Sequence, residues 1–197
     1  LCDDHVILLV VDEVQSGIAR TGRMFACEHW DVIPDVMTLA KGLGNGMPVG
    51  AVVARHEVMD AWHAGDHGTT YGGNPIACAA VCAVLDTIVD DDLCARARRL
   101  GAEAMSRMRA WQAWEPRLQE VRGLGLMIGL EFHEADGTPG KHLVEAIEAA
   151  ALRRDLLVLS CGTRGNVIRL IPPVTVPEDE LAEGLDRLEA VLEEMHA

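Results

Sequence analysis

Two lysines stand among the 17 lysine and arginine residues of this chain, and their settings differ. Lys41 follows the apolar run 36–39 and precedes a glycine-rich segment, residues 42–46, where backbone can approach a ligand closely. Lys141 begins a charged amphipathic segment, where a lysine is typically solvated. A lysine in a desolvated pocket can lose its proton and form a Schiff base, whereas arginine stays protonated. Lys41 is therefore either the residue for such chemistry or the end of a strand before a glycine turn.

A pair of acids, Asp12 and Glu13, ends a second apolar run, residues 6–11. In P-loop ATPases such a pair holds Mg²⁺ and water, but that interpretation requires a GxxxxGKS or GxxxxGKT loop. The Gly-Lys pair at 140–141 lacks both the first glycine and the final hydroxyl residue. Three alternatives stay open: a nucleotide site whose loop lies outside this sequence, two surface acids, or an acid that contacts a ligand at the carboxyl end of a strand.

A loop rich in glycine and hydroxyl groups precedes a predicted helix start. Thr69 and Thr70 lie in the segment 67–75 together with three glycines. Asn74 is a favourable N-cap, and Pro75 suits the first helical position. Such loops bind phosphate with backbone N–H and hydroxyl groups in place of lysine. The alternative is an ordinary capped loop.

Two further motifs predict no site. The segment 42–50 departs from GxGxxG because Met47 occupies the third glycine position, so a dinucleotide site is weakly supported. His63 and His67 are four residues apart, but glycine and aspartate between them favour a loop, and no carboxylate partner is evident. We therefore expect no metal site.

The composition excludes several classes of partner. The net charge is −14, and no basic run exceeds two residues, which argues against nucleic-acid binding. The longest apolar run, residues 77–85, is far shorter than the ~20 residues that span a bilayer, so we expect no membrane partner. Six cysteines without a CxxC motif fit reduced thiols in a cytoplasmic protein. The chain begins at Leu1 without a methionine or a signal peptide, which we interpret as an internal start.

The elements that position these motifs begin with an α/β region. The segment 75–88 predicts an apolar core helix, with Cys78 and Cys82 on one buried side. Ligands collect at the carboxyl ends of strands in parallel sheets. Three continuous β-rich apolar runs are typical of strands buried on both faces of such a sheet: residues 6–11, 36–39 and 50–54.

The second half changes to shorter units and predicts a smaller α+β domain. A long amphipathic helix over 92–114 connects the two parts. We place the domain boundary so that residues 1–91 form part of a large domain and residues 92–197 form the connecting helix and the small domain. After the connector we expect a strand at 126–132, a turn at 136–140, a helix at 141–154, strands at 156–160 and 167–171, and a helix after Pro177.

Taken in order, several motifs resemble the class-III (omega) aminotransferases, which use pyridoxal phosphate. The resemblance covers nearly the whole chain, although complete members are much longer, so the chain resembles their C-terminal portion. It implies an α/β protein of fold type I, with a partial large-domain sheet followed by a small α+β C-terminal domain. The motifs are Asp12 to Gly17 with Arg20-Thr21-Gly22, Ala40-Lys41-Gly42, Gly68 to Pro75, Val121 to Gly125, Leu159 to Gly162, and Asn166 to Pro173.

By this resemblance Lys41 is the catalytic residue that forms the Schiff base with the cofactor aldehyde and later carries the proton. Asp12 pairs with the protonated pyridine nitrogen of pyridoxal phosphate, which keeps the ring an electron sink. Gln15 hydrogen-bonds near the phenolic oxygen of the ring. These three residues form the implied cofactor contacts of the first half of the chain.

The resemblance also implies contacts to phosphate and substrate. Thr70, with Thr69 in the same loop, binds cofactor phosphate, and the phosphate that Thr70 contacts belongs to the neighbouring subunit. The implied partner is thus a second copy in a homodimer with a shared active site. Arg169 binds the substrate α-carboxylate, a bidentate task that suits guanidinium, and a surface ion pair is the alternative. Ile18-Ala19 stands where many members have Phe-Gly.

Two segments indicate different amino donors. Residues 42–51 resemble acetylornithine aminotransferases, whereas residues 159–173 resemble 4-aminobutyrate aminotransferases. We expect a 4-aminobutyrate-like omega-amino donor with 2-oxoglutarate as the acceptor 2-oxo acid, and an acetylornithine or ornithine type is the alternative. A hypothesis of another class is a non-catalytic, truncated fragment that retains only a role in oligomerisation.

Overall fold

A computed structural model describes residues 1–196 and divides the chain into two compact units, Leu1–Ala95 and Arg96–Ala197. Each unit has its own sheet, and the two are described separately below. Within residues 1–196 no helix is both long enough and apolar enough to cross a bilayer.

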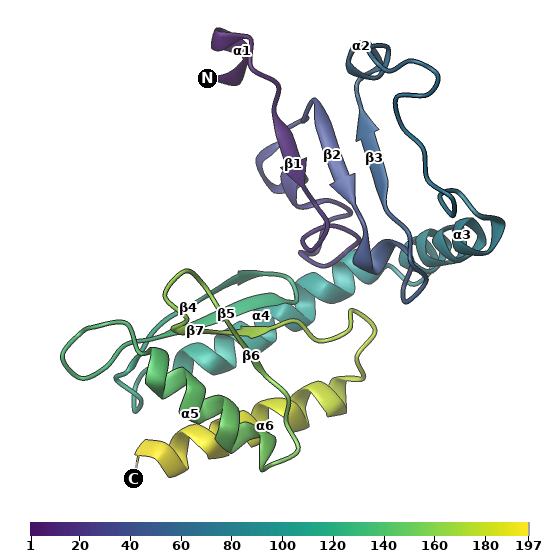
Figure 1. Cartoon of the computed structure of the whole chain (residues 1–197). Coiled ribbons are helices and arrows are strands. Elements are labelled where there is room, and N and C mark those ends of the chain that lie inside the picture. The colour runs from purple at the N-terminus through teal and green to yellow at the C-terminus, as the bar shows by residue number, and fades with distance from the viewer. Residues whose placement is uncertain (197) are drawn as a thin grey trace. The chain divides into compact units, whose positions relative to one another are not determined.

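The first unit is built on a three-stranded sheet with the order β1-β2-β3 (Figure 1). Strands β1 (Val10–Asp12) and β2 (Val36–Leu39) are parallel, and β3 (Ala51–Ala54) runs antiparallel to β2. The expected parallel sheet is therefore parallel in one pair only. The helical elements of the unit are α1 (Cys2–His5), η1 (Ala26–Trp30), η2 (Lys41–Leu43), α2 (His56–Met59) and α3 (Pro75–Asp90).

The first strand is shorter and more exposed than the sequence predicts. Strand β1 begins at Val10, and the residues before it include α1 and a left-handed Val6. The expectation of a strand over 6–11 that is buried on both faces is wrong for this structure. The physical reason is that β1 is an edge strand, paired within residues 1–196 with β2 alone. The exposed apolar residues of the segment 6–11 are Val6, Ile7, Leu8 and Val10.

Helix α3 begins where predicted but is not a core helix. Asn74 caps it by accepting a hydrogen bond from the Ala77 N–H at 2.9 Å, and Pro75 occupies the first helical position. Only Ala77 and Ile88 are buried along the helix. Cys78 and Cys82 are exposed, so the expected burial of these two thiols is wrong. The other large apolar side chains of the helix include Ile76 and Val89, which are exposed.

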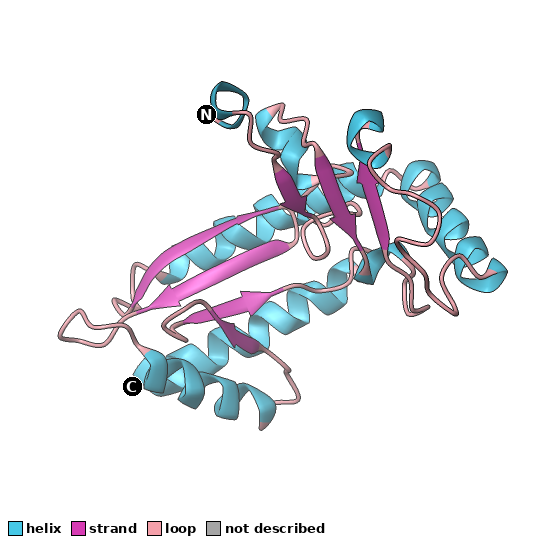
Figure 2. Ribbon diagram, turned by 45° about the horizontal axis from the view of Figure 1, so that its top comes forward, coloured by secondary structure: helices cyan, strands magenta, loops and turns pink. Residues whose placement is uncertain are grey.

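The second unit carries an antiparallel four-stranded sheet with the order β4-β5-β7-β6, shown in magenta in Figure 2. Helices pack on one of its faces, because buried residues from α4, α5 and α6 form one cluster with alternate residues of β5. The elements are α4 (Leu93–Trp111), β4 (Leu118–Leu124), β5 (Met127–Phe132), α5 (Lys141–Leu152), β6 (Leu159–Cys161), β7 (Val167–Leu170) and α6 (Glu178–His196).

Strand β4 was not predicted from the sequence. Its buried residues Leu118 and Val121 are three apart, because the register against β5 shifts between Leu118 and Glu120. Such a bulge breaks the two-residue alternation that identifies a strand. The predicted strand at 126–132 corresponds to β5, and the predicted helices at 141–154 and after Pro177 correspond to α5 and α6.

Candidate active site

Asp12 is the last residue of β1, and Lys41 comes two residues after the end of the neighbouring parallel strand β2. In the β1–β2 ladder Asp12 pairs with Thr38, and the next backbone N–H, of Glu13, donates to the Thr38 carbonyl at 3.0 Å. Lys41 comes three residues after Thr38 and opens η2. The end of a parallel sheet where two loops leave adjacent strands is a common ligand position in α/β proteins. The structure thus brings the ends of these two strands together, as the sequence motifs require.

Lys41 presents a free amine on a constrained backbone. Its φ is 47°, in the left-handed region, and the turn after it is closed by the Gly44 N–H donating to the Lys41 carbonyl at 3.2 Å. Its side chain forms no ion pair with any residue in the range 1–196. Lys41 is exposed in this structure.

Asp12 is exposed, and its orientation is set locally. Its Oδ1 accepts a hydrogen bond from the Val14 N–H at 2.9 Å, which turns the carboxylate toward the start of the following loop. Gln15 lies one residue further on and is half-buried. The backbone of the loop therefore holds the Asp12 carboxylate in place.

Glu13 is a structural residue that the sequence did not single out from its neighbour. It is 1% exposed. Its Oε1 accepts from the Cys27 N–H at 2.8 Å and its Oε2 accepts from the Ser16 hydroxyl at 2.5 Å. Burial raises the pKa of the Cys27 thiol, and the adjacent Glu13 carboxylate raises it further. Glu13 thus ties together both ends of the loop that carries Asp12.

Thr69 and Thr70 lie in an exposed loop before α3. Within residues 1–196 neither hydroxyl forms a hydrogen bond, and the structure does not join them to Asp12 or Lys41 by any polar contact. Asn74 closes the loop by donating from Nδ2 to the Tyr71 carbonyl at 2.9 Å. A Cβ at Gly72 would overlap the Thr69 methyl group, so this glycine permits a tight turn. Both hydroxyls are therefore available to a ligand.

Arg169 belongs to the second unit. On β7 it is directly opposite Gly129 of β5 and Leu159 of β6, so all three lie on the same face of the sheet. Its Nε is buried and has no hydrogen-bond partner within the described residues 1–196. An unpaired buried guanidinium N–H is costly, and a carboxylate ligand would satisfy it.

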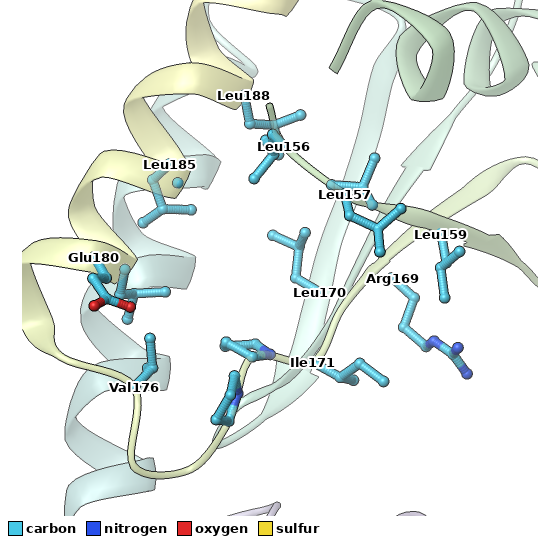
Figure 3. Close-up of a pocket in the computed structure, with 15 residues that line it drawn as sticks. Leu156, Leu157, Leu159, Arg169, Leu170, Ile171, Val176, Glu180, Leu185 and Leu188 are labelled. Carbon is cyan, nitrogen blue, oxygen red and sulfur yellow. The ribbon is translucent and has the colours of Figure 1, made fainter. Parts of the chain in front are cut away.

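A cavity of about 380 Å³ lies beside Arg169, between α6 and the segment from β6 to β7. Its wall is largely apolar, and Arg169 lies at one rim with its guanidinium turned away from α6 (Figure 3). Within residues 1–196 no group of three or more His, Cys, Asp or Glu side chains is placed to hold a metal ion.

Comparison with known proteins decides the family. The family described as Aminotransferase class-III matches residues 1–192. The chain belongs to the class-III aminotransferases. This finding confirms the resemblance seen in the motifs, and it removes the P-loop ATPase interpretation of Asp12 and Glu13.

Two curated class-III relatives have different activities in their names. The acetylornithine aminotransferase of Methanopyrus kandleri is 48% identical over 188 residues, which cover 95% of this chain and 46% of the relative. The 4-aminobutyrate aminotransferase of Mycobacterium leprae is 43% identical over 193 residues, which cover 97% of this chain and 43% of the relative. The chain therefore spans about half the length of the curated relatives it matches.

The structure agrees with this class-III membership. The acetylornithine aminotransferase of Elizabethkingia anophelis superposes with a TM-score of 0.87 at 39% identity, over 98% of this chain and 47% of that one. The fold is the fold type I of aminotransferases, as the motifs implied. The roles of Lys41, Asp12, Gln15, Thr69, Thr70 and Arg169 stay predictions.

Proposed function

We propose that this chain provides part of the active site of a pyridoxal-phosphate-dependent transaminase. The proposed reaction moves an amino group from a 4-aminobutyrate-like omega-amino donor to 2-oxoglutarate. The observation that carries the proposal is the position of Lys41, a lysine without an acid partner in the described residues, after the strand beside the one that ends at Asp12. An acetylornithine or ornithine-type donor is the alternative.

The residues present suit the cofactor. The Lys41 amine has no carboxylate among residues 1–196 that would hold it as a charged partner, and the Asp12 carboxylate lies at the end of the adjacent strand. When bound, pyridoxal phosphate supplies an aldehyde that reacts with amines and a ring that withdraws electrons. Lys41, Asp12 and Gln15 would hold its ring, and Thr69 and Thr70 would hold phosphate through their free hydroxyls.

Lys41 and Asp12 would divide the proton chemistry between them. In its neutral form the Lys41 Nζ can attack a carbonyl carbon and can take up or release a proton, which arginine cannot do. Asp12, with Oδ1 held by the Val14 N–H, would keep a proton on the pyridine nitrogen by electrostatic attraction. These are two opposite tasks, one needing a neutral amine and one a charged carboxylate.

Arg169 would bind a carboxylate group, which both the amino donor and the 2-oxo acid carry. Its unpartnered Nε supports this assignment, because a two-point interaction with a carboxylate uses one Nε and one terminal N–H. In an apolar setting such a charge-assisted pair is stronger than in water. Leu159, which is paired with Arg169 on the same face of the sheet, is an apolar neighbour.

A second hypothesis belongs to another class than enzymes. A folded but non-catalytic chain that retains only oligomerisation would bind no amino donor productively. The proposal of full activity includes a second copy of the chain as partner, and Thr70 would contact the cofactor phosphate bound by that copy. It also places the enzyme in the cytoplasm.

The test is glutamate formation from 2-oxoglutarate by the purified chain with added pyridoxal phosphate. We would compare 4-aminobutyrate, N-acetylornithine and ornithine as donors, with Lys41→Ala as the test variant and Lys141→Ala as the control. The proposal expects 4-aminobutyrate to be the fastest donor and expects activity to vanish in Lys41→Ala alone. Activity that survives in Lys41→Ala contradicts it, and a folded chain without activity toward any donor supports the oligomerisation hypothesis.

A further inference from the structure

The cavity beside Arg169 has an almost entirely apolar wall. Among the described residues that line it, Arg169 and Glu180 are charged, and the others are apolar or glycine. They range from Leu188 of α6, which is 1% exposed, to Leu157 just before β6, which is 77% exposed. A volume of about 380 Å³ lies within the range of small-molecule pockets, roughly 300–1,000 Å³. The cavity can therefore take a hydrocarbon chain that enters from solvent.

The positive charge of Arg169 is not neutralised within residues 1–196. Its Nε is buried without a hydrogen-bond partner, and its side chain forms no ion pair in that range. Glu131 is an acid of the same sheet face, because it lies two residues from Gly129, which is paired with Arg169. The Glu131 carboxylate, however, contacts Arg122 at 2.7 Å and accepts from Asn166 Nδ2 at 3.3 Å. Arg169 therefore has a buried N–H that an external carboxylate would satisfy.

Glu180 makes the two sides of the cavity electrostatically different. It belongs to the first turn of α6 and lies across the cavity from Arg169 (Figure 3). A ligand with one carboxylate can pair with Arg169 and keep its apolar end toward α6. A second carboxylate at that end would meet the like charge of Glu180 and would leave water for an apolar wall. The cavity is therefore complementary to a monocarboxylate and not to a dicarboxylate.

We propose that Arg169 and this cavity form a binding site for aliphatic monocarboxylates. The carboxylate group would lie at the rim, because the guanidinium is turned away from α6 (Figure 3), and would accept hydrogen bonds from Nε and one terminal N–H of Arg169. The hydrocarbon chain would occupy the cavity between α6 and the segment from β6 to β7.

This site rests on the carboxylate-binding role that the proposed function gives to Arg169, and it adds a class of ligand that is not a substrate. An aliphatic acid whose chain occupies the cavity would compete with the 2-oxo acid for the same guanidinium. Its affinity would come from two sources, the charge-assisted hydrogen bonds at Arg169 and the burial of its methylene groups.

Two pairs of variants separate these sources. Arg169→Gln removes the guanidinium, and Arg164→Gln is its control, because Arg164 is exposed in the turn between β6 and β7. Gly184→Leu adds a side chain at a position of α6 that lines the cavity. Ala182→Leu is its control, because it adds the same side chain to an exposed position of α6 outside the lining.

The experiment is calorimetric titration of the purified chain, without cofactor, with butanoate, hexanoate and hexanedioate. We expect the Kd to fall about fourfold for each methylene added between butanoate and hexanoate. Hexanedioate should bind more weakly than hexanoate. Arg169→Gln should weaken the binding of both monocarboxylates about tenfold or more. Gly184→Leu should remove the advantage of hexanoate over butanoate, and Arg164→Gln and Ala182→Leu should behave as the wild type.

Equal affinity of the wild type for butanoate and hexanoate would overturn the inference, and this comparison remains valid if a variant does not fold. So would unchanged hexanoate binding in Arg169→Gln or in Gly184→Leu, or an equal loss in either control. Failure of the proposed function is distinct, because it is read from cofactor retention through Lys41 on the same preparation. Retained cofactor without chain-length dependence contradicts only the monocarboxylate site.

Discussion

Asp12 and Thr38 are paired in the parallel ladder of β1 and β2, and the chain reaches Lys41 three residues after Thr38. This register fixes where the two loops leave the sheet. A shift of one residue in the ladder would turn alternate side chains to the opposite face and move Asp12 away from the end of the strand. The candidate site therefore depends on the ladder as much as on its own side chains.

The loop that carries Asp12 depends on Glu13. Glu13→Gln would place an amide N–H₂ where one oxygen now accepts from the Cys27 N–H or the Ser16 hydroxyl. Leaving a buried donor without its acceptor costs about 1–3 kcal/mol of the free energy of unfolding. Ser16→Ala removes the hydroxyl that donates to Glu13 Oε2 and lies 3.5 Å from the Asp12 carbonyl oxygen, and it should cost about 1 kcal/mol. Urea denaturation measures the free energy of unfolding of both variants. Equal stability of Glu13→Gln and the wild type would contradict the structural role of Glu13.

Two glycine-to-alanine changes in the second unit should have opposite signs. Gly101 on α4 lies so close to Gly125 that an added Cβ would overlap the Gly125 carbonyl oxygen. Gly101→Ala must displace backbone and should destabilise by about 1–3 kcal/mol. Gly184 lies within α6, where an added Cβ would make an ordinary 3.8 Å contact with Leu156. Gly184→Ala should raise the free energy of unfolding by about 0.5–1 kcal/mol through helix propensity.

Thermal or urea denaturation of Gly101→Ala and Gly184→Ala measures the two changes in the free energy of unfolding. If Gly101→Ala is as stable as the wild type, the prediction from the close approach of Gly101 to Gly125 is contradicted. A destabilised Gly184→Ala would indicate that α6 has no room at that position.

The sequence predicts the positions of several of these features for local reasons. Lys41 after an apolar run and Asn74 before Pro75 are short-range patterns, and the structure contains both the strand end and the helix cap. The burial of Glu13 next to an exposed Asp12 could not be predicted, because two adjacent acids at a strand end have the same local sequence signal. What separates them is the position of Cys27, whose N–H lies against Glu13 only after the loop folds.

Burial in the first unit is the part that the sequence predicted poorly. Apolar composition indicates which strands and helices can be buried, but burial also requires neighbouring elements to cover them. Val10 on the edge strand and Cys78 on α3 are exposed because the described residues supply no such cover. The bulge in β4 is a similar case, since its spacing depends on pairing with β5.

The stability of the second unit should depend on pH through Glu115. Burial alone would raise the pKa of this carboxyl, but hydrogen bonds and charge from Arg117, with a smaller effect of His196, lower it below its ordinary value. The Glu115–Arg117 pair closes at 2.6 Å, and Arg117 also donates to the Met195 carbonyl at 3.1 Å near the end of α6.

A carboxyl whose pKa is lowered by folding contributes stability above its unfolded pKa, roughly 4.3 for glutamate, and loses it as the pH falls through the folded value. Glu115→Gln should therefore be less stable than the wild type at pH 7, by up to about 3–5 kcal/mol, the cost of breaking a buried pair. The difference should shrink as the pH falls below about 4.3. Urea denaturation between pH 3 and 7 measures this difference, and a constant difference across that range would contradict the assignment.

Arg169 should affect the binding of carboxylate substrates. Arg169→Lys keeps the charge but loses the two-point geometry, so the apparent KM for the 2-oxo acid should rise about tenfold or more. Arg164→Ala is the control, since Arg164 is exposed in the turn between β6 and β7. Steady-state kinetics of the active enzyme separates the two variants. The assignment fails if the KM of Arg169→Lys equals that of the wild type or if Arg164→Ala has the same effect.

The central claim, that Lys41 is the residue that holds the cofactor, is tested most directly by absorbance. Purified wild type, Lys41→Ala and Lys141→Ala would each be incubated with pyridoxal phosphate, dialysed and scanned. The account predicts that wild type and Lys141→Ala retain the cofactor band and that Lys41→Ala loses it. Identical spectra of wild type and Lys41→Ala after dialysis would contradict it.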